Sequence, residues 1–356
     1  MTLYKEWALA IALIATCLTT PSQAHDGQAL AKDTCVLIDT DYDIDDMMAI
    51  PLVIGNRHVA GVVMSEGYTL PQEGAAALQR LITQPQQRKI PIIVGGQQDN
   101  TGRKDLQAWP WLPFYRAMMN QSNGLLPQVP VPAPISKDYR QEVVDATAAC
   151  SEVSVLIIGT YTSFVQYSAR LRHKIKQVVV MGQPIGDDSR TPGRESFNCS
   201  YDMPACQTAM EQLKGMSTAF IDIPRDTTPL YEPSEAMVTA LGEEGLPGAL
   251  KKALINNFDC SGQFSRYGHN MPVQPQGPYS ACTSKSTWVP HWVHQGPGGE
   301  MLLWDQAAAL YLLHPEIFSP KGAHWEPTLV DNSPQTTIQR MRQYWTEDTN
   351  KAIQYR

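Results

Sequence analysis

Short apolar runs rich in β-branched residues alternate with amphipathic segments along this chain, and this alternation constrains the fold most. The predicted strands cover residues 36–39, 59–64, 90–94, 153–158, 177–181 and 218–221. The predicted helices cover residues 45–54, 71–82, 136–149, 161–171, 202–213 and 335–352. Apolar runs joined by helical crossovers are typical of a parallel sheet buried on both faces. We therefore predict an α/β fold with an open, mostly parallel, doubly wound (Rossmann-like) sheet flanked by helices.

Two long segments, residues 97–134 and 260–299, interrupt this rhythm and are rich in proline and aromatic residues. Loops of that length inside a compact domain are usually functional. We expect both to border the active site.

The N-terminus has the pattern of an export signal. Lys5 precedes an apolar stretch over residues 7–19 that is short for a membrane span, and small residues precede His25. This pattern predicts a secretory signal peptide cleaved after Ala24. A buried N-terminal helix or a membrane anchor is the alternative. We expect a periplasmic or secreted protein that does not contact the membrane after cleavage, with one catalytic domain over residues 25–356.

Six cysteines remain once the signal is removed, and an even number is compatible with disulfides in an exported protein. Cys35 and Cys150 each precede a predicted strand, which would place them at the same end of neighbouring parallel strands. Sequence alone allows several pairings, and buried free cysteines are the alternative. The predicted pairs are Cys35–Cys150, Cys199–Cys206 and Cys260–Cys282.

The charge balance argues against a nucleic-acid partner. The chain has 28 Lys and Arg against 35 Asp and Glu, for a formal net charge of −7. Binding to nucleic-acid phosphates needs clustered Lys and Arg. A small molecule is the better candidate partner.

Five aspartates lie within the eight residues from Asp39, the last residue of the first predicted strand, to Asp46. In an open parallel sheet, ligands bind beyond the carboxyl ends of the strands. Clustered carboxylates repel one another unless a cation neutralises them, and hard oxygen ligands suit Ca²⁺ or Mg²⁺. Helix N-capping with a solvated acidic turn is the alternative. An EF-hand fits poorly, because Ile44 stands where its loop requires glycine.

This acidic turn resembles the N-terminal signature of the calcium-dependent nucleoside hydrolases, the inosine/uridine-preferring N-ribohydrolases. The shared pattern is Asp39-Thr40-Asp41 followed by Asp45-Asp46 at a helix start. Other segments similar to the family's motifs follow in the same order, at residues 158–163, 178–182, 197–202, 223–228 and 304–305. The resemblance spans about residues 34–315.

The resemblance implies a calcium site and a general base. By motif, the implied Ca²⁺ ligands are Asp41, Asp46, the backbone carbonyl of Thr162, and Asp305. Asp41 would also accept the proton of a calcium-bound water as the general base. Taken singly, Asp305 could instead be a helix N-cap, and Thr162 a residue in the first turn of a helix.

The resemblance also implies a substrate site. Asp45 and Asn198 would hydrogen-bond the ribose hydroxyls, and Glu195 would take the role of the family's glutamate. Trp304 stands where many members carry the histidine that protonates the leaving base, so we expect aromatic stacking on the base instead. This substitution favours purine nucleosides, with uridine as a further substrate.

Three other positions depart from the family pattern. Asp43 replaces the usual glycine of the acidic turn, and Gln183 replaces the second glycine of a Met-Gly-Gly segment. Glu66-Gly67 stands where Gly-Asn is expected, so one asparagine that contacts the sugar is missing.

The implied activity is hydrolysis of the N-glycosidic bond of ribonucleosides to ribose and free base, with Ca²⁺ as cofactor. One alternative is hydrolysis of another ribosyl compound at the same metal site. The other is an exported, non-catalytic Ca²⁺-dependent protein that binds ribose or a nucleoside. Such a protein would be expected to lose the attacking base, yet Asp41 is present. Self-association into a homo-oligomer stays open.

Overall fold

The protein is described by a computed structural model, which covers residues 34–83, 89–97, 112, 134–182, 184, 196–224, 234–257 and 303–354. The proposed signal peptide and Glu195 lie outside these described residues, as do Gln183, Cys260 and Cys282. So does nearly all of the two long segments expected to border the site.

An eight-stranded sheet forms the centre of the molecule, in the order β3-β2-β1-β4-β5-β6-β8-β7. All neighbouring strands are parallel except β7 and β8, which form an antiparallel pair at one edge. The strands are β1 (Thr34–Thr40), β2 (Val59–Met64), β3 (Ile92–Val94), β4 (Glu152–Ile157), β5 (Ile175–Met181), β6 (Thr218–Ile221), β7 (Phe318–Lys321) and β8 (His324–Pro327). The predicted open, mostly parallel α/β sheet is confirmed.

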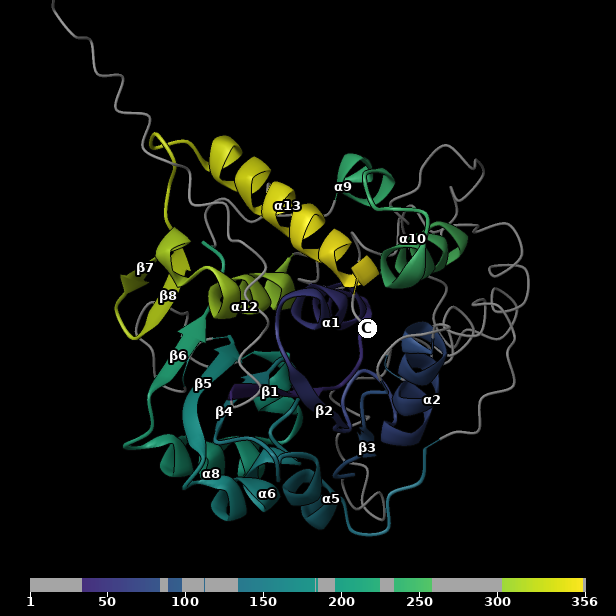
Figure 1. Ribbon diagram of the computed structural model, residues 1–356. Coiled ribbons are helices and arrows are strands. Elements are labelled where there is room, and N and C mark those ends of the chain that lie inside the picture. Colours follow the sequence, from purple (N-terminus) through teal and green to yellow (C-terminus); the bar gives the residue numbers. More distant parts are fainter. Residues whose placement is uncertain are drawn as a thin grey trace, which may run out of the picture.

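Helices cover both faces of this sheet (Figure 1). One layer contains α1 (Ile44–Asn56), α2 (Pro71–Ile82), α9 (Glu235–Thr239), α10 (Gly245–Asn257), α12 (Trp304–Leu313) and α13 (Pro334–Asn350). The other contains α5 (Tyr139–Ala146), α6 (Phe164–Leu171) and α8 (Met203–Leu213), preceded by the short α7 (Phe197–Tyr201).

Strand β1 contributes alternate side chains to the two hydrophobic cores, one on each face of the sheet. Val36 and Ile38 pack into the core of the α1 layer, while Cys35 and Leu37 pack into that of the α6 layer. All four are at most 3% exposed. Successive side chains of a strand point to opposite faces, so a strand covered on both sides is apolar throughout.

Helix α13 braces α1 from the far end of the chain. The indole Nε1 of the buried Trp345 donates a hydrogen bond to the backbone carbonyl of Met48 on α1, at 2.9 Å. Asn56 at the end of α1 donates to the backbone carbonyl of Asp348 on α13, at 3.1 Å. His314, which follows α12, contacts the Asp348 carboxylate at 2.6 Å. Helices α1, α12 and α13 therefore form one packed unit.

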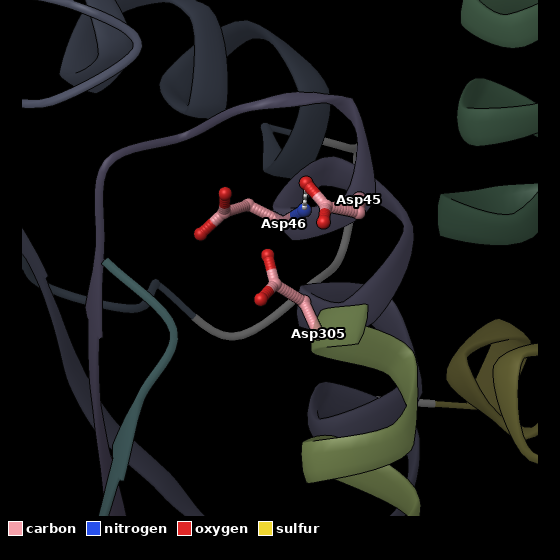
Figure 2. Close-up of side chains that lie close together, drawn as sticks. All are labelled: Asp45, Asp46 and Asp305. Carbon is pink, nitrogen blue, oxygen red and sulfur yellow. Dashed lines mark hydrogen bonds between the residues drawn. The ribbon is translucent and has the colours of Figure 1, made fainter. Parts of the chain in front are cut away.

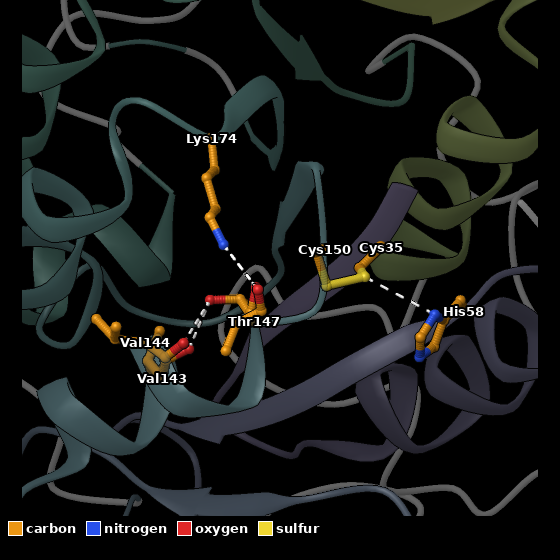
Figure 3. The surroundings of a disulfide bond; sticks show 8 residues. Cys35, His58, Val143, Val144, Thr147, Cys150 and Lys174 are labelled. Carbon is orange, nitrogen blue, oxygen red and sulfur yellow. Dashed lines mark hydrogen bonds between the residues drawn. A yellow bond between two sulfur atoms is a disulfide. The ribbon is translucent and has the colours of Figure 1, made fainter. Parts of the chain in front are cut away.

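Two of the three predicted disulfides, Cys35–Cys150 and Cys199–Cys206, are present among the described residues. Cys35 lies at the amino end of β1, and Cys150 precedes β4, which pairs with β1 (Figure 3). Cys199 lies on α7 and Cys206 on α8. The third predicted pair lies outside the described residues.

None of the helices in the described parts of the chain has the length and apolar character needed to span a lipid bilayer.

Candidate active site

The site lies at the carboxyl end of β1, where the order of the strands reverses. From β1 the chain continues to β2 and β3 on one side, whereas β4, β5 and β6 follow on the other. Loops that leave β1 and β4 at such a point diverge, so a crevice opens between them. A Cβ on Gly159, just after β4, would overlap the backbone at Thr40 and Asp41, so only glycine permits this close approach.

The turn after β1 starts helix α1 and fixes the aspartates within it. Tyr42 has a positive φ of 53°, which reverses the chain direction. Asp43 caps α1 with its side chain, and the Asp46 carboxylate accepts a bond from the Asp43 backbone N–H at 2.8 Å. This reciprocal capping box places Asp45 and Asp46 in the first turn, at the positive end of the helix dipole.

The carboxylates of Asp45, Asp46 and Asp305 converge in the interior (Figure 2). Each offers an oxygen that lies within 4.8 Å of those of the other two. The three residues are 8%, 1% and 1% exposed. Asp45 and Asp46 come from α1 and Asp305 from the first turn of α12, so the two helices packed by α13 carry the whole cluster.

These three buried acids fit a hard divalent cation. Burial, and next the neighbouring carboxylates, raise the pKa of all three groups well above the ordinary aspartate range. Asp305 Oδ1 is buried with no hydrogen-bond partner among the described residues. Ca²⁺ binds oxygens at about 2.3–2.6 Å, so oxygens on opposite sides of one ion lie about 4.6–5.2 Å apart. One ion can therefore contact all three carboxylates and offset their repulsion.

Asp41 lies beside this cluster and is held by the loop after β2. Its Oδ2 accepts a hydrogen bond from the backbone N–H of Tyr68 at 2.9 Å, and its backbone carbonyl accepts from Thr69. A Cβ on Gly67 would overlap the Asp41 carboxylate, so glycine is needed here. Burial raises the pKa of the Asp41 carboxyl to about 7, opposed by the Tyr68 hydrogen bond and reinforced by Asp43.

Asp39 lies below the site in a buried hydroxyl network. It accepts hydrogen bonds from Ser65 at 2.5 Å and from the Tyr167 hydroxyl at 3.0 Å. The Ser65 hydroxyl oxygen can then accept from the Ser163 hydroxyl, at 2.6 Å. Burial raises the pKa of Asp39 to about 7 despite these two hydrogen bonds. The network ties the end of β1 to the loops after β2 and β4.

Three other residues expected at the site, Asn198, Thr162 and Trp304, are not part of the cluster of Asp45, Asp46 and Asp305. The Asn198 side chain donates to the backbone carbonyl of Ile158 after β4, at 2.9 Å. Thr162 donates through its hydroxyl to Asp202, at 2.7 Å. Trp304 begins α12 next to Asp305 and packs, partly buried, against the core. The structure thus groups Asp45, Asp46 and Asp305, and places Thr162 on the loop after β4 and Asn198 on α7, which follows β5.

Tyr68 and Glu66, on the loop after β2, were not among the site residues expected from the sequence. The Tyr68 ring contacts the Phe197 ring with centroids 4.1 Å apart. Burial, and next the neighbouring aspartates led by Asp43, raise the pKa of Tyr68. Glu66, 1% exposed, accepts a hydrogen bond from the Tyr201 hydroxyl at 2.7 Å. Both residues directly follow β2, at the same edge of the sheet as Asp41, and this position in the sequence could have indicated that they lie near the site.

A model of the inosine-uridine preferring nucleoside hydrolase family matches residues 36–353 of the chain. No curated protein gives a significant match. Several solved structures share the fold. An inosine-uridine preferring nucleoside hydrolase from Bacillus anthracis is 12% identical, with 90% of this chain and 99% of that one covered and a TM-score of 0.53.

A purine-preferring ribonucleoside hydrolase from Gardnerella vaginalis is 15% identical, over 90% of this chain and 99% of that one, with a TM-score of 0.52. The effector protein XOO4466 is 14% identical, over 91% and 95% of the two chains, with a TM-score of 0.58. At these identities the structural likeness shows a shared fold.

Proposed function

This chain belongs to the inosine-uridine preferring nucleoside hydrolase family and is a nucleoside N-glycosyl hydrolase, and from that membership we propose that it uses Ca²⁺ and favours purine nucleosides. The products are ribose and the free base, and uridine is a further substrate. The observation that carries the proposal is the buried convergence of Asp45, Asp46 and Asp305 at the carboxyl edge of the sheet.

Four groups would hold the cation: the carboxylates of Asp41, Asp46 and Asp305, and the backbone carbonyl of Thr162. Asp46 and Asp305 are supported by their convergence, and Asp41 by its place beside them on the loop after β1. A calcium ion bound there would supply the positive charge that favours ionisation of water and binding of sugar hydroxyls. Asp45, the third converging acid, is proposed to accept a hydrogen bond from the ribose.

Asp41 is proposed as the general base. Burial raises its pKa, and a bound cation would lower it again, so that the carboxylate would be ionised and able to accept a proton. The backbone N–H of Tyr68 donates to Asp41 Oδ2 and so fixes the orientation of the Asp41 carboxylate. The water oxygen attacks C1′ while its proton passes to Asp41. The bond from C1′ to the base nitrogen breaks with its electron pair, and the leaving base takes up a proton from solvent, to which Asp41 later releases the proton it accepted.

The substrate groups are proposed on the same basis. Asn198 is buried at the rim, and its amide is oriented by the carbonyl of Ile158. We propose that Asn198 and Asp45 bind the ribose hydroxyls, with Glu195 as a further contact. Trp304 adjoins Asp305, and stacking of its ring on the base is the basis for the purine preference.

The assay is release of free base from inosine, adenosine, guanosine, uridine and cytidine, with calcium and with a chelator. Asp41→Asn should lower kcat by about 10³-fold or more, since the general base is lost. Asp331→Asn is the matched control: it makes the same chemical change at an exposed residue with a positive φ, which asparagine tolerates. If calcium-loaded protein releases no base, or Asp41→Asn keeps full activity, the proposal is wrong. A larger kcat/KM for uridine than for every purine nucleoside would refute the purine preference.

Export is proposed for the same chain, with cleavage after Ala24 and a single catalytic domain over residues 25–356. The two disulfides support it, because such bonds persist in oxidising compartments. Mass spectrometry of the mature protein should find His25 as its first residue. An N-terminus at Met1 in the mature protein would contradict this proposal.

A further inference from the structure

Helix α7 forms one wall of the rim and is too short to hold itself in place. It has five residues, and an isolated helix of that length is unstable in water. Three of its side chains, Phe197, Asn198 and Tyr201, reach the loops that border the site; we call them the α7 wall. Their position therefore depends on contacts outside the helix.

Each residue of the α7 wall contacts a different point of the rim. Phe197 packs on the Tyr68 ring, next to the N–H that holds Asp41. Asn198 bonds the backbone after β4, and the Tyr201 hydroxyl bonds the buried Glu66 at 2.7 Å. The wall thus bridges the loops after β2 and β4 on either side of the crevice.

The Cys199–Cys206 disulfide fastens this wall to a helix that is itself anchored. Cys199 lies between Asn198 and Tyr201, and Cys206 is fully buried on α8. Helix α8 is held against α6, where Gln212 donates to the Val165 carbonyl at 3.0 Å. One covalent bond therefore transmits the rigidity of α8 to all three wall residues.

The cluster of buried acids belongs to the opposite layer. Asp45, Asp46 and Asp305 are carried by α1 and α12, whose core lies on the other face of the sheet from that of α7 and α8. Loosening α7 should therefore alter contacts with the substrate and leave the acidic cluster intact.

We propose that the Cys199–Cys206 disulfide is a positioning element for the nucleoside: by fixing the α7 wall it sets substrate affinity, separately from the metal site. This rests on the proposed function, in which Asn198 binds the ribose. Cys199 and Cys206 act through Asn198 and Tyr201 and do not touch the substrate themselves.

The other disulfide provides a matched control. Cys35–Cys150 joins the amino ends of β1 and β4, and Asp41 lies six positions after Cys35, about 20 Å along an extended chain. Figure 3 shows it near Thr147, whose backbone carbonyl accepts a hydrogen bond from Lys174. The disulfide lies at the amino ends of β1 and β4, whereas the site lies at their carboxyl ends. Its removal should affect stability and not the wall.

The test compares Cys199→Ser/Cys206→Ser with Cys35→Ser/Cys150→Ser. The first should raise KM for the preferred nucleoside about tenfold, with kcat within about threefold and calcium affinity, measured by calorimetry, within about twofold of wild type. The second should leave KM within about twofold, since KM does not depend on the folded fraction. Equal KM changes in both variants, or no change in the first, would overturn the proposal.

Two further measurements cover the remaining outcomes. If Cys199→Ser/Cys206→Ser does not fold, Tyr201→Phe loosens the same wall with both disulfides intact. It should raise KM about threefold or more, and an unchanged KM would overturn the proposal. If wild-type protein releases no base, the proposed function has failed. Hydrogen exchange over residues 197–201 then decides: it should be about tenfold faster in the first variant only, and unchanged exchange refutes the positioning role.

Discussion

Removing calcium should make the stability of this protein strongly dependent on pH, because buried carboxyls must then ionise without a compensating charge. Burial raises the pKa of Asp41 from 3.8 to about 7. Between these two values the folded protein keeps a proton that the unfolded chain has released. The unfolding free energy of the cation-free protein therefore falls as the pH rises from about 4 to about 7, and the loss is complete above that.

The size of the effect follows from the shift. Moving from 3.8 to about 7 is about 3 pKa units, and each unit corresponds to about 1.4 kcal/mol, so Asp41 alone accounts for about 4 kcal/mol. Calcium binds the ionised carboxylates, so its effect has the opposite sign. At a calcium concentration about a thousandfold above its Kd, binding adds about 4 kcal/mol to the unfolding free energy.

Urea unfolding followed by circular dichroism measures this directly, at about pH 5 and about pH 8, on metal-free protein with and without added calcium. Metal-free protein should be less stable at the higher pH by about 3 kcal/mol or more, because about two of the three pKa units of the Asp41 shift fall between these pH values, and calcium should reduce the difference. Asp41→Asn should reduce the pH dependence by about 3 kcal/mol, while Asp331→Asn keeps all of it. Equal stability of the metal-free protein at both pH values would refute the reasoning.

Three further predictions concern single contacts. Replacing Cys35 and Cys150 by serine opens a link across 115 residues and should lower the unfolding free energy by about 4–5 kcal/mol, measured in denaturant. Gly67→Ala should displace the Asp41 carboxylate and weaken calcium binding about tenfold or more by calorimetry, and unchanged affinity would contradict the proposed ligand role. Trp345→Phe keeps most of the ring but leaves a carbonyl of α1 without its donor, so it should cost about 1–3 kcal/mol in thermal unfolding.

Sequence patterns were sufficient where local chemistry sets the structure. The strand predicted over 59–64 and the helix over 71–82 have the observed bounds, since apolar continuity and a proline at the helix start define them. The pairing of Cys35 with Cys150 followed from their places before two apolar runs that become neighbouring strands, and it is confirmed.

Other parts of the fold depend on contacts that no local pattern reveals. Strands β7 and β8 are four residues each and contain proline, lysine and glutamate, which are uncommon in strands, so the edge hairpin was not predicted. Helix α7 was missed because five residues carry no clear period.

The same limit applies to the site. Residues that directly follow predicted parallel strands were expected at the carboxyl edge of the sheet. This placed Asp41, Asp45 and Asp46 at that edge. It did not predict that the Tyr68 N–H would hold Asp41, or that Tyr201 would reach Glu66 across 135 residues. Both contacts depend on the directions of side chains in loops, which the strand pattern leaves open.

The bond from Trp345 to α1 joins residues 297 positions apart, so the acidic cluster depends on contacts of very high sequence separation. Closing so large a loop has an entropic cost that must be met before the contact can stabilise the chain. A fragment that ends before α12 would retain Asp41, Asp45 and Asp46 but lack both Asp305 and the brace. The proposed calcium binding should therefore be a property of the completed tertiary structure, and in refolding it would report the last long-range docking step.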